Sequence, residues 1–201
     1  MASSGVGSQA RVERYDGVAI ALHWLLAGLI LANLLLALNF EQLHGAARGA
    51  PIRLHKSIGV TILVLGLARG LWRLARRPPP LPPELSPLTR RTAKAAHAGL
   101  YVLMVVTPLS GWAMISADAG GRSTVIWGAA PWPRIRALVD LPPATREVLH
   151  TALNGVHLAL GLTLAALIAV HVAGAFRHQL RGVRELERIL PAWLARDARR
   201  P

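Results

Sequence analysis

The sequence predicts an all-α integral membrane protein, a bundle of four transmembrane helices. The 201-residue chain is 53% hydrophobic, which is more than soluble domains of this length usually are. Its mean hydropathy is +0.39. Four stretches are apolar over the roughly 20 residues that a helix needs to cross the hydrocarbon core of a bilayer. We therefore expect one membrane domain over residues 18–176, between a polar N-terminal segment (1–17) and a basic tail (177–201).

The first two predicted spans are separated from the rest of the chain by a proline-rich linker. Span one covers residues 18–38. No site typical of signal-peptide cleavage follows it directly, so we interpret it as a retained helix. Span two covers residues 54–74 and is followed by residues 76–83, in which five of the eight residues are proline. Consecutive prolines cannot form the interior of a helix, so this segment predicts an extended linker.

The second half of the chain predicts two further spans with a long connection between them. Span three covers residues 94–116 and contains Pro108, which should kink the helix. Residues 117–150 form the longest predicted connection, and its tryptophans suit a membrane interface. Span four covers residues 155–176. The tail then predicts a short amphipathic helix, with an apolar face formed by Leu186, Ile189 and Leu190.

The basic residues predict the orientation of the chain in the membrane. A formal net charge of +13 would suggest nucleic acid as the partner of a soluble protein. Here the basic residues flank the apolar spans, and no basic groove rich in aromatic residues is visible, so we expect no nucleic-acid binding. With Arg69, inside span two, left aside, 15 Lys and Arg residues fall on one side of the predicted topology and seven on the other. The positive-inside rule therefore predicts that both termini are cytoplasmic.

Histidines are the candidate cofactor ligands. The chain has no cysteine, which excludes thiolate-held iron–sulfur clusters and covalently attached c-type haem. Four of its eight histidines lie in the spans or at their ends: His23, His55, His157 and His171. Ionisable side chains at membrane depth are costly, so each needs a reason. A single one could hydrogen-bond a neighbouring helix, and a set of them could relay protons in a transporter.

The spacing of these histidines favours two haem sites over those alternatives. His157 and His171 are 14 residues apart, so they project from one face of a helix and lie about 21 Å apart along its axis. In the predicted topology His23 shares the cytoplasmic level with His171, and His55 shares the outer level with His157. Each level then has two imidazoles from different helices, which suits bis-histidine ligation of one haem. Six-coordinate haems leave no open iron position, so we expect outer-sphere electron transfer.

Several basic residues near these two levels could bind anions. Arg69 lies 14 residues after His55, which places it at the cytoplasmic level, and Arg73 follows one turn later. Both could bind haem propionates, although Arg73 could instead reach lipid headgroups. Arg53 and Lys56 flank His55 on the outside. They could attract a small anion such as superoxide or contact headgroups.

The other four histidines have no clear partner in the sequence. His97 lies early in span three, where it could serve a quinone, carry protons or contact a neighbouring helix. We expect His44 and His150 in solvated loops and His178 at the interface. If the fourth helix began early, His150 could take the place of His157. We prefer His157, because His150 would lie farther outside the bilayer.

Three segments resemble one known family. They are Arg14-Tyr15-Asp16 through Leu22-His23-Trp24-Leu25, then Leu54-His55-Lys56-Ser57-Ile58-Gly59 with Arg69 and Arg73, and Tyr101 to Gly111 with Pro108. Together with the histidine spacings they resemble bacterial cytochrome b561 over about residues 10–180. One residue departs from that pattern, because Leu158 stands where a polar or acidic residue often follows the first histidine of the fourth span.

The resemblance implies a four-helix cytochrome of the bacterial inner membrane with two non-covalent haems b. By position, His23 and His171 would bind the cytoplasmic-side haem, and His55 and His157 the periplasmic-side haem. Members pass electrons between the ubiquinone pool and a periplasmic partner, and one proposed direction oxidises superoxide and reduces ubiquinone. Related cytochrome b subunits instead anchor a periplasmic redox enzyme, in which case residues 117–150 would be the docking surface.

Overall fold

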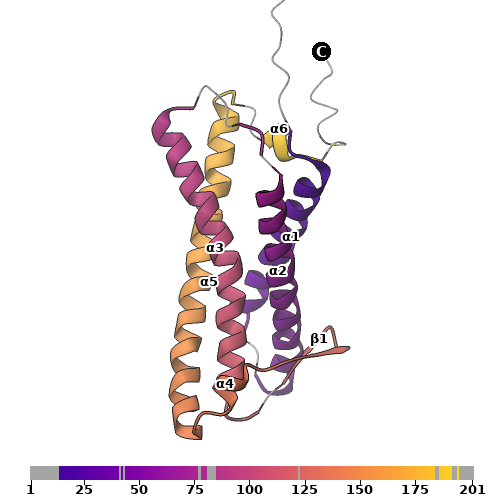
Figure 1. Cartoon of the computed structure of the whole chain (residues 1–201), viewed down its shortest axis with the longest axis vertical. Coiled ribbons are helices and arrows are strands. Elements are labelled where there is room, and N and C mark those ends of the chain that lie inside the picture. The colour runs from indigo at the N-terminus through magenta and orange to yellow at the C-terminus, as the bar shows by residue number, and fades with distance from the viewer. Residues whose placement is uncertain are drawn as a thin grey trace, which may run out of the picture.

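Four long helices dominate the structure (Figure 1). The computed structural model describes residues 14–40, 42, 44–76, 78–80, 85–121, 123–183, 186–191 and 194, without the side chain of residue 46. The long helices are α1 (Gly17–Leu38), α2 (Gly49–Ala75), α3 (Pro87–Ala117) and α5 (Pro143–Leu180). All four are long and apolar enough to cross a membrane, which confirms the predicted four-helix class.

The helix ends lie beyond the predicted spans. α2 begins five residues before residue 54, α3 seven before residue 94 and α5 twelve before residue 155. Hydropathy marks only the part of a helix that lies in the bilayer, whereas the 38 residues of α5 reach about 57 Å at 1.5 Å per residue. The hydrocarbon core is about 30 Å thick, so α5 continues into the interface at its ends.

Local sequence explains where these helices begin. The side chain of Asp16 caps α1 by accepting a hydrogen bond from the backbone N–H of Ala19 at 2.9 Å. Ser86 caps α3 in the same way through Thr89. α3 and α5 both have proline in their first turn, where its missing N–H costs nothing. Pro108 lies inside α3 without ending it.

The long helices form two pairs. α3 packs along α5, α1 packs along α2, and the pairs meet where α2 contacts α3. Figure 1 shows the two pairs side by side. Within the described residues, α5 is not closely packed against α1 or α2. The buried core lies midway along the bundle and consists of Leu26, Ile30, Ile58, Ile62, Met104 and Leu164.

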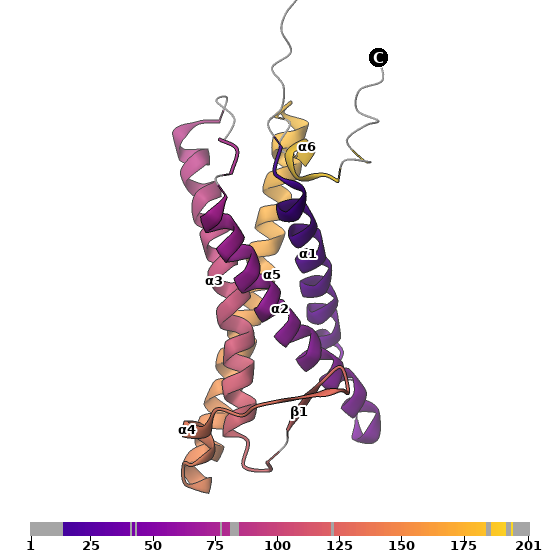
Figure 2. The same ribbon diagram turned by 45° about the vertical axis from the view of Figure 1, so that its right-hand side comes forward.

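The connection between α3 and α5 contains secondary structure that the sequence analysis did not predict. β1 (Thr124–Ile126) and β2 (Ala130–Trp132) pair as an antiparallel hairpin. A short helix, α4 (Arg136–Val139), follows it. The hairpin crosses the lower part of the bundle toward α2 (Figure 2). We call this the hairpin end; the 3₁₀ turn η1 (Gly45–Arg48), which precedes α2, also lies there.

The opposite end of the bundle is marked by α6 (Leu186–Ile189), and we call it the α6 end. A short helix therefore does lie in the predicted tail, although its buried side chain is Arg188 rather than an apolar one. The Arg188 guanidinium donates a hydrogen bond of 2.7 Å to the carbonyl of Pro80. Much of the basic tail, including Arg184 and residues 195–201, lies outside the described residues.

Candidate functional site

Two pairs of histidine rings lie at two levels of the bundle. Near the α6 end, the ring centres of His23 on α1 and His171 on α5 are 6.4 Å apart, with planes at 66°. Nearer the hairpin end, those of His55 on α2 and His157 on α5 are 6.1 Å apart, with planes at 90°. These are the pairings that the depth argument expects. Leu164, midway between the two histidines of α5, belongs to the core that separates the levels.

The spacing within each pair fits two ligands on opposite faces of one iron. Metal–imidazole bonds are about 2.0 Å long and the nitrogen lies about 1.1 Å from the ring centre, so two such rings have centres about 6.2 Å apart. Both pairs join helices that are not otherwise closely packed within the described part of the chain. Closely packed helices have axes about 8–10 Å apart, so this looser arrangement suits a flat macrocycle.

The ring nitrogens of the pair near the hairpin end are also oriented for ligation. His157 Nδ1 lies 2.9 Å from Ser110 Oγ and 3.0 Å from the carbonyl oxygen of Thr107. His55 Nδ1 lies 3.3 Å from the carbonyl oxygen of Asn33. Histidines that bind metals usually donate their other ring N–H to such an acceptor, which sets the tautomer. Nε2 of each ring is then the nitrogen left for iron.

A glycine on α3 allows the close approach to His157. A Cβ atom added at Gly111 would lie 3.0 Å from Cε1 and 3.3 Å from Nδ1 of this ring. Any larger residue would therefore move the imidazole. Across the described chain, no three histidine, aspartate or glutamate side chains converge as ligands of a metal ion. Near the hairpin end the imidazoles of His55 and His157 thus form a pair, which is the number of axial ligands that a porphyrin leaves open on its iron.

Comparison with known proteins decides the family. The model of the family described as prokaryotic cytochrome b561 matches residues 14–192. The chain belongs to that family. This cytochrome is therefore a multi-pass protein of the bacterial inner membrane that binds haem b and takes part in electron transfer.

Individual relatives agree with this assignment. Cytochrome b561 homolog 2 of Escherichia coli (strain K12) is 35% identical over 122 residues, which are 59% of this chain and 64% of that protein. The match thus spans slightly less than two thirds of the relative's length. "Probable superoxide oxidase CybB" of Yersinia pestis is 28% identical over 165 residues, 80% of this chain and 90% of that protein. Cytochrome b562 of Cereibacter sphaeroides is 31% identical over 123 residues, which are 58% of this chain and 72% of that protein.

Arg69 lies at the level of the pair near the α6 end. Its Nη1 donates a hydrogen bond of 2.8 Å to the carbonyl of Ala19, and its Nη2 lies 3.4 Å from His23 Nδ1. The guanidinium also stands over the ring of Tyr101, 5.8 Å from its centre. Arg73 lies one turn farther along α2, within electrostatic range of His97. Arg69 and Arg73 thus both lie near histidines of the α6 end.

The remaining histidines of the cytochrome take different positions. The ring of His97 on α3 is centred 5.2 Å from that of His171. His150 lies inside α5 rather than in a solvated loop, and its Nδ1 is 2.9 Å from the carbonyl oxygen of Met114. The helix thus begins early enough for His150 to stand two turns before His157, yet the ring facing His55 is that of His157. His178 lies in the last turn of α5.

Sequence reasoning missed several residues that surround the pairs. Phe40 lies edge-on to His55, with ring centres 5.2 Å apart, and Trp24 lies edge-on to His23 at 5.3 Å. Asn33 and Ser110 are polar residues inside apolar spans, and that contrast is a signal that could have marked them. Phe40 offers no such signal, because an aromatic residue at a helix end is common.

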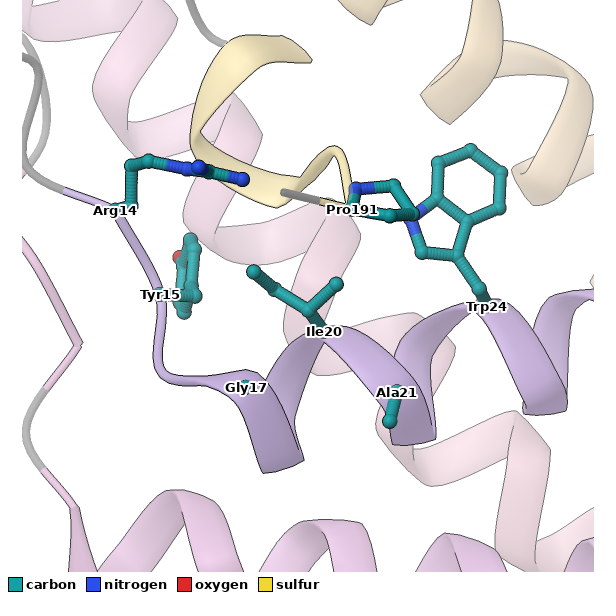
Figure 3. Close-up of a pocket in the computed structure, with 7 residues that line it drawn as sticks. All are labelled: Arg14, Tyr15, Gly17, Ile20, Ala21, Trp24 and Pro191. Atoms are coloured by element: carbon teal, nitrogen blue, oxygen red, sulfur yellow. The ribbon is translucent and has the colours of Figure 1, made fainter. Parts of the chain in front are cut away.

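A groove at the α6 end lies beside the helix that carries His23. It has a volume of about 440 Å³ and is lined by Arg14, Tyr15, Gly17, Ile20, Ala21, Trp24 and Pro191. Figure 3 shows Arg14 and the Trp24 indole on either side of Pro191, with Ile20 below. The groove thus combines an apolar floor with a guanidinium.

Proposed function

We propose that this cytochrome carries electrons across the membrane through two b haems, between the ubiquinone pool and a donor on the periplasmic side. The proposal rests on one observation: four imidazoles form two pairs, in which the ring centres are 6.4 Å and 6.1 Å apart. His23 and His171 would hold one haem, and His55 and His157 the other. Each haem supplies a one-electron ferric/ferrous couple.

Arg69 supports a haem propionate near the α6 end. A neutral imidazole has one N–H and one acceptor nitrogen. If His23 Nδ1 accepts from Arg69, its Nε2 carries the proton and cannot bind iron. Ligation through Nε2 therefore releases Nη2 of Arg69, which needs a new acceptor in a half-buried position. A propionate carboxylate suits this guanidinium, and we assign the same role to Arg73.

We place the α6 end in the cytoplasm, because the excess of Lys and Arg falls there. The groove beside α1 supports a quinone at this end, since its apolar floor suits a ring and its Arg14 guanidinium can donate to a quinone oxygen. At the periplasmic end, Arg53 is exposed and Lys56 half-buried beside His55, and the two could attract an anion.

Superoxide is the donor that the name of the Yersinia pestis relative supports. Oxidation of two superoxide anions to dioxygen releases two electrons. Those electrons, with two protons from the cytoplasmic side, reduce one ubiquinone to ubiquinol. In this scheme the basic residues around His55 concentrate the anion, and the histidine pairs hold the redox groups at two depths.

An alternative function is that of a membrane anchor for a periplasmic redox enzyme. The hairpin end favours it, because apolar side chains there are exposed: Val125 by 40%, Trp127 by 56% and Val148 by 72%. Copurification of a stable partner would support the anchor. Ubiquinone reduction by the isolated chain supplied with superoxide would support the main proposal.

The decisive experiment counts haems and assigns them. A pyridine haemochrome assay with a reduced-minus-oxidised spectrum should give two haems b per chain. His23→Ala or His171→Ala should remove only the haem near the α6 end. His150→Ala is the matched control and should keep both, because the ring that faces His55 is that of His157. One haem in the parent protein, or loss of both from His23→Ala, would contradict the assignment.

A further inference from the structure

The histidine pairs bridge helices that share the central core but are not closely packed along their lengths. α5 carries one histidine of each pair, and the partners lie on α1 and α2. Within the described helices, α5 is not closely packed against either of them. The core lies between the two levels, and a few tenths of an ångström matter to a metal ligand, so contacts near each level are needed to fix the distance across each pair.

At the α6 end, the segment that follows α5 is hydrogen-bonded to the start of α1. The indole Nε1 of Trp24 donates to the carbonyl of Ile189 at 2.9 Å. The backbone N–H of Tyr15 donates to the carbonyl of Arg188 at 3.1 Å. The guanidinium of Arg14 donates to the carbonyl of Leu190, and Figure 3 shows it reaching toward this segment.

At the hairpin end, the segment that follows α3 is hydrogen-bonded to α2. The backbone N–H of Trp127 donates to Ser57 Oγ at 3.0 Å, and its indole donates to Thr61 Oγ1 at 3.2 Å. Trp127 has φ +52° and is followed by Gly128 at φ +73°. A bulky residue rarely adopts this conformation. The two hydrogen bonds to α2 hold the turn in this strained conformation.

Each of the two contacts involves a residue that is close in sequence to a histidine of one pair. Trp24 directly follows His23, and Ser57 comes two residues after His55. In each case the partner belongs to a segment that continues from the opposite helix pair. The connection therefore runs from one helix pair across to the other, within one turn of the histidine on α1 or α2.

We propose that α6 and the hairpin are two straps that set the positions of His23 and His55 relative to α5. Trp24 and Ser57 are then positioning residues, each for the haem at its own level. This inference rests on the proposed function, because it takes the two histidine pairs as axial ligands. The opposing view is that the central core alone aligns α1 and α2, in which case each contact would affect both levels or neither.

The test uses Trp24→Phe and Ser57→Ala in the full-length haem-loaded protein. Trp24→Phe keeps an aromatic ring and loses the N–H, and Ser57→Ala loses the hydroxyl that accepts from Trp127. The control for the first is Trp72→Phe, whose indole donates to Asp16 within the α1–α2 pair. The control for the second is Thr163→Ala, whose hydroxyl donates to the carbonyl of Ala159 within α5.

Three readouts separate the levels: the EPR signals of the two low-spin ferric haems, their midpoint potentials, and the rates of haem transfer to apomyoglobin. We expect Trp24→Phe to shift only the haem near the α6 end, and Ser57→Ala only the other one. Each should release its own haem about fivefold faster, as expected for one hydrogen bond. Thr61→Val gives a second variant of the hairpin strap.

The possible results distinguish the two proposals. Parent protein without two bis-histidine haems refutes the proposed function. If the parent protein holds both haems, but each variant changes the signals of both haems equally or of neither, the straps alone are refuted. Equal shifts from the control variants would refute them too.

Discussion

Replacing Gly111 by alanine should disturb one haem and spare the other. The new methyl group would lie 3.0 Å from Cε1 of His157, well inside the 3.4–4 Å of ordinary contact. The imidazole must therefore shift by a few tenths of an ångström. It cannot do so freely, because Ser110 and Thr107 hold its Nδ1 and because it must stay aligned with His55 to share one iron.

The expected magnitude follows from overpacking. Adding one methyl group to a well-packed site costs about 1–3 kcal/mol, and each 1.4 kcal/mol is about tenfold in affinity. Haem binding at the level of His157 should therefore weaken by about 5- to 140-fold. The level of His23 should be unchanged, since it lies about four helical turns away along α5.

The assay is a haem-to-protein ratio with EPR on the same sample. Gly161→Ala is the matched control, because it lies on α5 and no described atom falls within 4 Å of its added Cβ. The reasoning would be refuted if Gly111→Ala retained both haems with unchanged EPR signals, or if it lost the haem near the α6 end. A similar loss from Gly161→Ala would point to a general effect of alanine on the helices.

Two further predictions concern the α6 end. Arg69→Gln removes a positive charge beside His23. Loss of this charge favours the ferric state, so redox titration should show a lower midpoint potential for the haem near the α6 end alone. An unchanged midpoint potential would show that Arg69 does not lie at the haem site. At Asp16, hydrogen bonds from the backbone N–H of Ala19 and the Trp72 indole outweigh desolvation and lower its pKa below 3.8. The stabilisation by this carboxylate is complete above the unfolded-state pKa and is lost as the pH falls through the folded one. The fluorescence of Trp72 should therefore change in acid in the parent protein and show no such transition in Asp16→Asn.

Four helices and their order could be predicted from the sequence, because burying a backbone in lipid requires about 20 consecutive apolar residues. Helix ends could not be, since beyond the bilayer nothing demands apolar residues; α5 thus begins at Pro143, well before hydropathy rises. The same error placed His150 in a loop. Its carbonyl partner on α3 depends on how two helices pack, which no local pattern records.

At the candidate site, residue spacing and the Lys and Arg counts are enough to predict which histidines share a level. A 14-residue interval on one helix places two rings on one face at two depths, whatever the surrounding structure. What each ring contacts depends on how the helices and the hairpin pack in the folded chain. The acceptors of His157 come from residues 47 and 50 positions away along the chain, and the hairpin meets α2 through Trp127, 70 positions from Ser57. Such contacts arise from the packing of distant segments, and periodicity along the chain carries no information about them.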